Sequence, residues 1–192
     1  MAKGVTLHAV KVLADNGSGS TGGITKAMDW VATNAQRPAV ASMSLGGGFS
    51  AALNDAVSAI VSSGITVVTA SGNENTDGCS KSPGSAPAAI NVGSTDITDD
   101  RSSFSNYGSC LNIFAPGRDI LSSVVDSDTA SKAYSGTSMA CPHVSGAAAL
   151  LLMDNNDMTP AQVLAELVAQ ATPDAVKDAK TNSPNVLLFT EV

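Results

Sequence analysis

The chain has 192 residues, of which 43% are apolar and 14% charged, and its net charge is −7. This composition fits one domain with a hydrophobic core and excludes a disordered chain. The absence of any run of Lys and Arg argues against nucleic acid as a partner. The most apolar stretch, residues 146–153, is far shorter than the ~20 residues that a membrane span needs, so no membrane association is expected.

Hydrophobic patterning predicts alternating strands and helices in the first part of the chain. The predicted elements are a buried strand at 5–13, a helix capped by Ser20 or Thr21, a strand at 39–44, a helix capped by Ser50 and ended by Gly64, and a strand at 65–70. The order β-α-β-α-β predicts a parallel sheet with right-handed crossovers.

The second half is expected to hold further short strands and two more helices. A loop at 71–87 precedes predicted strands at 88–92, 111–114 and 120–125, and an edge strand is expected at 186–189. Residues 137–153 are apolar nearly all round, which predicts a buried helix. Thr159-Pro160-Ala161-Gln162 is typical of a capping box and begins a helix that ends near Ala171. No linker or repeat divides the sequence, so one domain over 1–192 is expected.

Gly17-Ser18-Gly19-Ser20-Thr21-Gly22 fits the G-x-G-x-x-G pattern between a predicted strand and a predicted helix. A dinucleotide-binding oxidoreductase would also carry an acidic residue about 20 positions later. Residues 37–42 contain no carboxylate. A flexible surface connection is therefore favoured over a dinucleotide site.

Ser138 stands just before or within the predicted buried helix, in Ser135-Gly136-Thr137-Ser138-Met139-Ala140-Cys141-Pro142-His143. Backbone N–H groups at a helix N-terminus favour developing negative charge. The pattern is not G-x-S-x-G, so an α/β-hydrolase elbow is not indicated. On these residues alone, a serine that caps a helix is the favoured interpretation.

Asn73 follows the predicted strand at 65–70, within Ala70-Ser71-Gly72-Asn73-Glu74-Asn75. Open α/β sheets place their ligands at the carboxyl ends of strands. An Asn side chain at such a position could donate a hydrogen bond to an oxyanion. The alternative is an ordinary turn.

Taken together, these two segments and Ser44-Leu45-Gly46-Gly47 resemble the subtilases, the S8 peptidase family, and in particular its proteinase K and aqualysin-like branch. Further segments that agree are residues 9–13, 28–32, 82–83, 101–108 and 183–185. The resemblance implies an α/β, three-layer subtilisin-like fold with a mostly parallel sheet between helices, whose N-terminal part is missing. It also implies a secreted serine endopeptidase that acts on polypeptides, with an N-terminal prodomain possible in the full-length parent.

The resemblance implies roles for individual residues. Ser138 would be the nucleophile, and Asn73 with the backbone N–H of Ser138 would stabilise the oxyanion. One group of residues would pair with the substrate backbone as an added strand, and another would line the pocket for the side chain before the cleaved bond. These groups are Ser44, Leu45 and Gly46, and Ala70, Ser71 and Gly72, respectively.

The aspartate and histidine motifs of the family have no counterpart in this sequence, and we expect the family pattern to continue upstream of Met1. On a helix, His143 would lie about 140° around the axis from Ser138, and His8 lies in the predicted buried strand; both are expected to be structural. A serine without a base is a poor nucleophile. Little or no peptidase activity is therefore expected of this chain, and the alternative is a non-catalytic peptide-binding relative or a pseudogene product.

The three cysteines are Cys79, Cys110 and Cys141, without a CxxC pair, so a zinc site is not expected. Their number allows one disulfide and one free thiol, or three reduced cysteines. Cys79 and Cys110 match a disulfide pair of aqualysin-like members, and the resemblance thus implies that they bridge and that Cys141 is free.

The resemblance implies no required cofactor, and calcium only as a structural ion. Its ligands by resemblance would be the carbonyls of Pro87 and Ala89 and the side chain of Asn112. The branch has an aspartate at that last position, whereas an amide brings no charge. We therefore expect calcium binding to be weak or absent.

Overall fold

The computed structural model describes residues 1–190 of the chain. Its helices are α1 (Thr21–Asn34), α2 (Ala51–Ser62), α3 (Thr137–Asp154), α4 (Pro160–Gln170) and the short 3-10 helix η1 (Gly78–Ser80). Its strands are β1 (Val40–Met43), β2 (Gly47–Gly48), β3 (Thr66–Ala70), β4 (Lys81–Ser82), β5 (Ile90–Thr95), β6 (Ile113–Pro116), β7 (Ile120–Ser123), β8 (Ser131–Tyr134), β9 (Thr172–Pro173) and β10 (Val186–Leu187).

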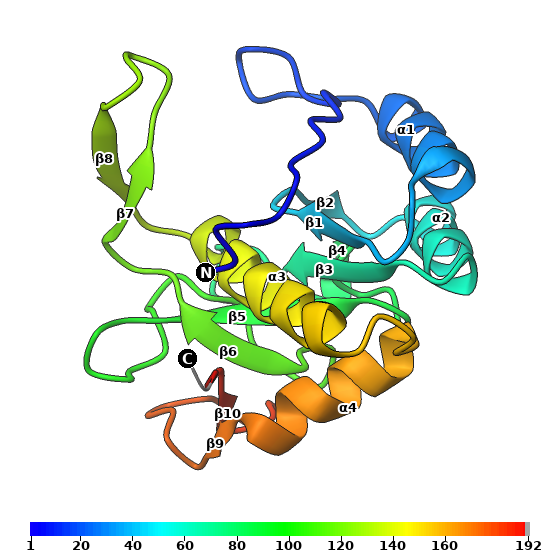
Figure 1. Ribbon diagram of the computed structural model, residues 1–192. Coiled ribbons are helices and arrows are strands. Elements are labelled where there is room, and N and C mark those ends of the chain that lie inside the picture. Colours follow the sequence, from blue (N-terminus) through cyan, green and yellow to red (C-terminus); the bar gives the residue numbers. More distant parts are fainter. Residues whose placement is uncertain (191–192) are drawn as a thin grey trace.

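A six-stranded sheet of order β1-β3-β5-β6-β10-β9 forms the centre of the molecule. Its first five strands run parallel, and β9 pairs antiparallel with β10. Two smaller antiparallel pairs, β2–β4 and β7–β8, lie outside it. The β7–β8 hairpin projects from the body of the protein, at the upper left of Figure 1.

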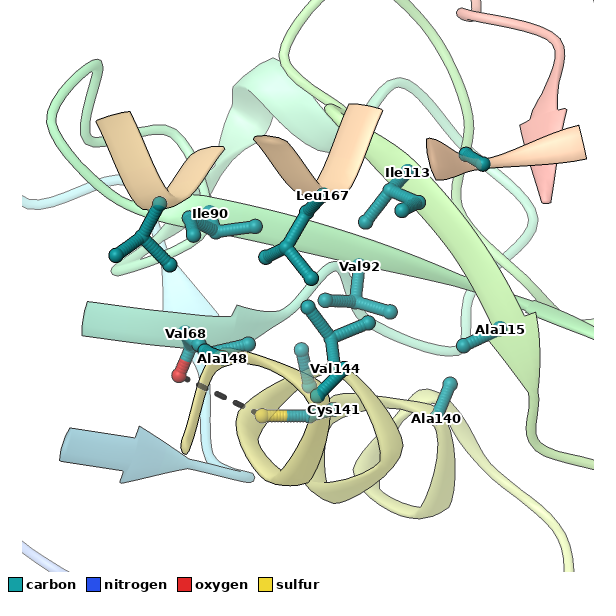
Figure 2. Close-up of a cluster of buried hydrophobic side chains, with 14 of the residues drawn as sticks. Val68, Ile90, Val92, Ile113, Ala115, Ala140, Cys141, Val144, Ala148 and Leu167 are labelled. Atoms are coloured by element: carbon teal, nitrogen blue, oxygen red, sulfur yellow. Dashed lines mark hydrogen bonds between the residues drawn. The ribbon is translucent and has the colours of Figure 1, made fainter. Parts of the chain in front are cut away.

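Helices cover both faces of this sheet. On one face, α3 and α4 pack against the strands in a cluster that includes Val92, Val144 and Leu167. Figure 2 shows side chains of both helices meeting those of the strands. On the other face, α1 and α2 pack with Val67 in a second cluster. Each fully buried side chain of this size contributes about 1.5–3 kcal/mol. The predicted three-layer α/β architecture is confirmed.

Local signals set the helix boundaries. Ser20, rather than Thr21, caps α1 by accepting from the N–H of Gly23 at 3.1 Å. Ser50 caps α2, and Gly64 follows that helix with a φ of +87°, in the region that favours glycine. The capping box at Thr159 is present at the start of α4. These features confirm the helices predicted from the sequence.

The predicted buried strand at 5–13 is absent. These residues have no strand structure and are mostly exposed, with Leu7 88% exposed. Figure 1 shows their trace passing from the N-terminus to the loop before α1 without joining the sheet. In the described part of the chain, β1 pairs only with β3, so no strand pairs with this segment. An extended segment without a partner gains no ladder hydrogen bonds and no buried face.

The remaining differences from the sequence-based predictions concern short strands. The C-terminal strand β10 is not at the edge, because β9 lies beyond it. The predicted short strand at 120–125 is confirmed as β7, which lies in the β7–β8 hairpin outside the main sheet. The strands β2, β4, β8 and β9 were not predicted; three of them have only two residues, too few for a periodic pattern.

Candidate active site

Ser138 is the second residue of α3, and its side chain is partly buried. Its Oγ donates a hydrogen bond to the backbone oxygen of Ser44 at 3.4 Å. Residues in the first turn of a helix have backbone N–H groups without intrahelical partners. The hydroxyl and the N–H of Ser138 therefore lie together at the positive end of a buried helix.

Pro142 leaves the backbone carbonyl of Ser138 free to bond to Ser44. In an α-helix the N–H of residue 142 would bond to the carbonyl of residue 138, but proline has no N–H. The freed carbonyl of Ser138 instead accepts from the Ser44 hydroxyl at 2.8 Å. Since the Ser138 hydroxyl also bonds back to Ser44, two hydrogen bonds hold the helix start against the end of β1.

Thr137 orients the side chain of Asn73. The Oδ1 atom of Asn73 accepts from the backbone N–H of Thr137 at 2.8 Å and from its hydroxyl at 3.0 Å. The Thr137 hydroxyl also accepts from the N–H of Gly72 at 3.1 Å. Because the carbonyl of the Asn73 amide is held in this way, its NH₂ group is the end of the side chain that remains to donate.

Two hydrogen-bond donors approach the same point in space. A Cβ atom placed on Gly136 would lie 3.6 Å from Nδ2 of Asn73 and 3.7 Å from the backbone N of Ser138. Gly136 thus leaves open the space that both donors border. Two N–H donors beside a serine hydroxyl form an arrangement that can stabilise an oxyanion.

A buried asparagine, Asn106, fixes the loop that carries Asn73. Its Nδ2 donates to the backbone oxygen of Ser71 and to Oε2 of Glu74, each at 2.8 Å. Its Oδ1 accepts from the N–H groups of Glu74 and Thr76. Gly72 has a φ of +101° and a Cβ there would collide with the Asn106 side chain, so this loop requires glycine.

A cleft of about 520 Å³ lies beside Ser138. All residues predicted to bind substrate line it, namely Ser44, Leu45, Gly46, Ala70, Ser71 and Gly72, together with Asn73 and Ser138. Residues 44–46 lie between β1 and β2. Gly17, Ser18 and Gly19 also line the cleft, so this segment, interpreted from the sequence as a surface connection, forms part of the site.

Neither histidine contacts Ser138 in the described part of the chain. The ring Nδ1 of His143 lies 2.8 Å from the backbone oxygen of Met139, one turn earlier in α3. His8 is exposed in the segment that was expected to be buried. No hydrogen bond joins a carboxylate to Ser138 within residues 1–190 either, so these residues place no general base at the hydroxyl.

A disulfide joins Cys79 and Cys110, whose Cα atoms are 5.2 Å apart, and Cys141 is a buried free cysteine, as predicted. The bridge ties the loop that follows Asn73 to the segment before β6. Burial raises the pKa of the Cys141 thiol, which also contacts Ser42 at 3.7 Å. The thiol is therefore protonated and packed within the core (Figure 2).

The residues expected to bind calcium fit that ion poorly. Oδ1 of Asn112 accepts the backbone N–H of Asn91 at 2.7 Å, so this oxygen is already engaged. Pro87 and Ala89 offer only neutral carbonyl groups. Within residues 1–190, no group of three or more His, Cys, Asp or Glu side chains is placed to hold a metal ion. Calcium takes six to eight oxygen ligands, among which carboxylates supply the negative charge, and this set of donors includes no carboxylate.

The fold and this site define an α/β protein with a serine-centred site at a helix N-terminus. A model of the subtilase family matches residues 1–187, and the chain therefore belongs to that family. In the described residues, no helix has the length and apolar character that crossing a membrane requires.

Curated relatives agree with this assignment. The chain is 54% identical over 190 residues to an extracellular serine proteinase of Thermus sp. (strain Rt41A), covering 99% of this chain and 46% of the relative. It is 50% identical to alkaline serine exoprotease A of Vibrio alginolyticus, covering 98% of this chain and 35% of that protein. The chain thus spans about half the length, or less, of these relatives.

A solved structure shows the same fold. The crystal structure of a cold adapted subtilisin-like serine proteinase matches with a TM-score of 0.91 and 47% sequence identity. The match covers 95% of this chain and 66% of the solved chain. The subtilisin-like fold implied by the sequence is therefore shown.

Proposed function

We propose that the chain carries the nucleophile, the oxyanion donors and the peptide cleft of a secreted, subtilisin-like serine endopeptidase. The observation that carries this proposal is that Ser138 and Asn73 line the same cleft, with the N–H of Ser138 and the oriented NH₂ group of Asn73 both beside Gly136. The name of the Thermus relative supports secretion, and the names of the Thermus and Vibrio relatives both support proteolysis.

In the proposed reaction, Oγ of Ser138 attacks the carbonyl carbon of the cleaved bond and gives up its proton. The carbonyl oxygen becomes an oxyanion that accepts from Nδ2 of Asn73 and from the N–H of Ser138. The C–N bond then breaks, the amine leaves with a proton, and water hydrolyses the acyl-enzyme. Ser44, Leu45 and Gly46 would pair with the substrate backbone, while Ala70, Ser71 and Gly72 would surround the side chain before the bond.

The proton of Ser138 needs an acceptor, and residues 1–190 place none beside it. We therefore expect the chain by itself to hydrolyse peptides very slowly. Losing the histidine or the serine costs on the order of 10⁶ in turnover, as is known for subtilisin, a member of this family. Rapid hydrolysis of a fluorogenic peptide that Ser138→Ala abolishes would contradict this expectation.

A peptide boronic acid tests the proposed chemistry without turnover, because boron accepts a serine oxygen and mimics the tetrahedral intermediate. We expect a tetrahedral boron signal in the ¹¹B NMR spectrum of the protein mixed with a peptide boronate. Ser138→Ala should abolish the signal, Asn73→Ala should weaken adduct formation about tenfold or more, and Ser127→Ala, at an exposed serine of the hairpin loop, should leave it unchanged.

A non-catalytic peptide-binding protein is the second candidate, favoured by the absence of a histidine contact to Ser138 within the described residues. It predicts that peptides bind the cleft equally well in the wild type and in Ser138→Ala, and that no tetrahedral boron signal forms. A tetrahedral adduct in the wild type alone would exclude it.

We propose that neither the peptidase nor the peptide-binding function requires a cofactor, and that calcium contributes little to the stability of the chain. The neutral donors at Pro87, Ala89 and Asn112 support this view. Addition of excess calcium or of a chelator should shift Tm by less than about 1–2 °C, since larger shifts of a domain of this size correspond to roughly 0.5 kcal/mol or more. We also propose that the cleft binds polypeptide substrates. A prodomain in the full-length parent is a further part of the proposal.

A further inference from the structure

Two opposite charges face the candidate peptide cleft. Of the described residues that line it, only Glu74 and Lys81 carry a charge, and the others are neutral and mostly small. Nζ of Lys81 lies 3.2 Å from Oε1 of Glu74. Charges in a cleft with neutral walls determine which charged ligands it accepts.

Both carboxylate oxygens of Glu74 already have partners. Oε1 pairs with Lys81, and Oε2 accepts from Nδ2 of the buried Asn106 at 2.8 Å. Burial alone would raise the pKa of Glu74, but the hydrogen bond from Asn106 and the ion pair with Lys81 lower it. Glu74 is thus an anion with engaged oxygens, and its side chain is 50% exposed, so water screens it.

The ammonium group of Lys81 has N–H donors that Glu74 does not use. Its ammonium group carries three N–H bonds, and within residues 1–190 Glu74 is its only charged partner. The side chain is 24% exposed, which makes it the less screened member of the pair. Its backbone is fixed, because Lys81 lies in β4 opposite Gly48 of β2 and its carbonyl accepts from the N–H of Ser85 at 2.8 Å.

We propose that Lys81 makes the cleft select polypeptides with a carboxylate side chain, Asp or Glu, at the residue bound beside it. The proposal rests on the proposed function, because it names the substrate class of the same cleft. A substrate carboxylate would accept the remaining N–H donors of Lys81, while Glu74 keeps its hydrogen bond from Asn106. A basic side chain would meet a carboxylate whose oxygens are both engaged, and Lys81 would repel it.

Binding of short peptides to the whole chain tests this inference. The probes are fluorescein-labelled Ala-Ala-Ala-Xaa amides with Xaa as Glu, Gln or Lys, measured by fluorescence polarisation near pH 7 at low salt. We expect the Glu peptide to bind about two- to fivefold more tightly than the isosteric Gln peptide, in the range of partly exposed ion pairs, and the Lys peptide to bind most weakly. Added salt should reduce the difference between the Glu and Gln peptides.

Four variants separate the role of Lys81 from net charge and from folding. Lys81→Met should remove the preference for Glu over Gln, Lys81→Arg should keep it, and Glu74→Gln should increase it by removing the competing anion. Lys26→Met removes the same charge from an exposed position of α1 and should change nothing. Circular dichroism spectra of all variants would identify any that fail to fold.

The results distinguish a failure of the inference about Lys81 from a failure of the proposed function. If the Gln peptide binds but the Glu peptide binds no better, or if the Lys peptide binds best, the inference about Lys81 is wrong and the peptide cleft stands. A preference that survives in Lys81→Met also overturns it. If no peptide binds at all, the proposed function itself fails, and the selectivity inference fails with it.

Discussion

Residues 5–13 and helix α3 are both apolar in sequence, yet α3 is buried and residues 5–13 are exposed. Helix α3 contacts four strands of the sheet and fills one side of the core. Residues 5–13 pair with no strand in the described part of the chain, and only Val12 and Leu13 at their end pack against a core cluster. An apolar segment is therefore buried only where another surface of the protein packs against it.

The residues that line the candidate cleft also differ in how firmly they are held. Asn73 and Ser138 are held by Thr137, Asn106 and the start of α3. Gly17, Ser18 and Gly19, which also line the cleft, follow the exposed segment and precede α1. The residues that would do chemistry are tied by hydrogen bonds to distant segments, whereas the hydrogen bonds of residues 17–19 in the described chain are local, to Ala14 and Asn16. This arrangement suits a site that must position one bond and accept varied peptides.

The largest effect on stability should come from the disulfide, because it cross-links the loop that follows Asn73 to the segment before β6. In the double variant Cys79→Ser and Cys110→Ser, we expect the free energy of unfolding in urea to fall by about 3–4 kcal/mol in the chain-entropy model, for a separation of 31 residues. Reduced wild-type protein serves as a control and should lose a similar amount. An unchanged midpoint in both would show that the bridge does not restrain this loop.

Matched Leu→Ala variants test the comparison directly. Leu152 of α3 is 6% exposed and Leu7 is 88% exposed. We expect Leu152→Ala to lower the free energy of unfolding by about 3 kcal/mol through lost burial and a residual cavity, and Leu7→Ala to change it by less than about 0.5 kcal/mol. Equal losses in urea unfolding would mean that residues 5–13 are packed in solution.

Local signals in the sequence predicted most of the fold. Ser20, Ser50 and Thr159 cap their helices through bonds to residues three positions away, so short patterns reveal them. The strand at 5–13 was wrong because its stability depends on a distant partner, which local periodicity does not report.

The candidate site was predictable only in part. The residue types around Ser138 alone favoured a helix cap, and the family resemblance supplied its proposed role. The part played by Thr137 was missed because its bond to Asn73 joins positions 64 residues apart. The only available signal was a second hydroxyl directly before Ser138 at a helix start. Gly17 to Gly19 form the exposed connection that was predicted, but their position beside the cleft was missed because nothing local shows which loop faces them.

The buried amide of Asn106 should give the next effect. Asn106→Ala leaves the carbonyl of Ser71 and the N–H groups of Glu74 and Thr76 without their partner, and we expect a loss of about 2–3 kcal/mol in the free energy of unfolding. Asn34→Ala is the control, because that exposed side chain makes one hydrogen bond to its own helix. Similar losses in both variants would show that Asn106 does not hold the loop.

The smallest effect concerns the ionisation of Glu74. Its pKa in the folded protein lies below the ordinary value of 4.5, because the bonds from Asn106 and Lys81 outweigh its burial. The folded state therefore binds this proton less readily than the unfolded state does. The resulting stability is fully present above about pH 5 and is lost as the pH falls through the lowered pKa.

The difference in the free energy of unfolding between wild type and Glu74→Gln measures this contribution. With the side chain half exposed, we expect less than about 1 kcal/mol near pH 7, decreasing below pH 5 in urea unfolding at each pH. High salt should reduce the difference at pH 7, since the ion pair with Lys81 is partly open to solvent. A difference that instead grew on acidification would mean that Glu74 is protonated more easily in the folded state, and that burial, not its two partners, controls its charge.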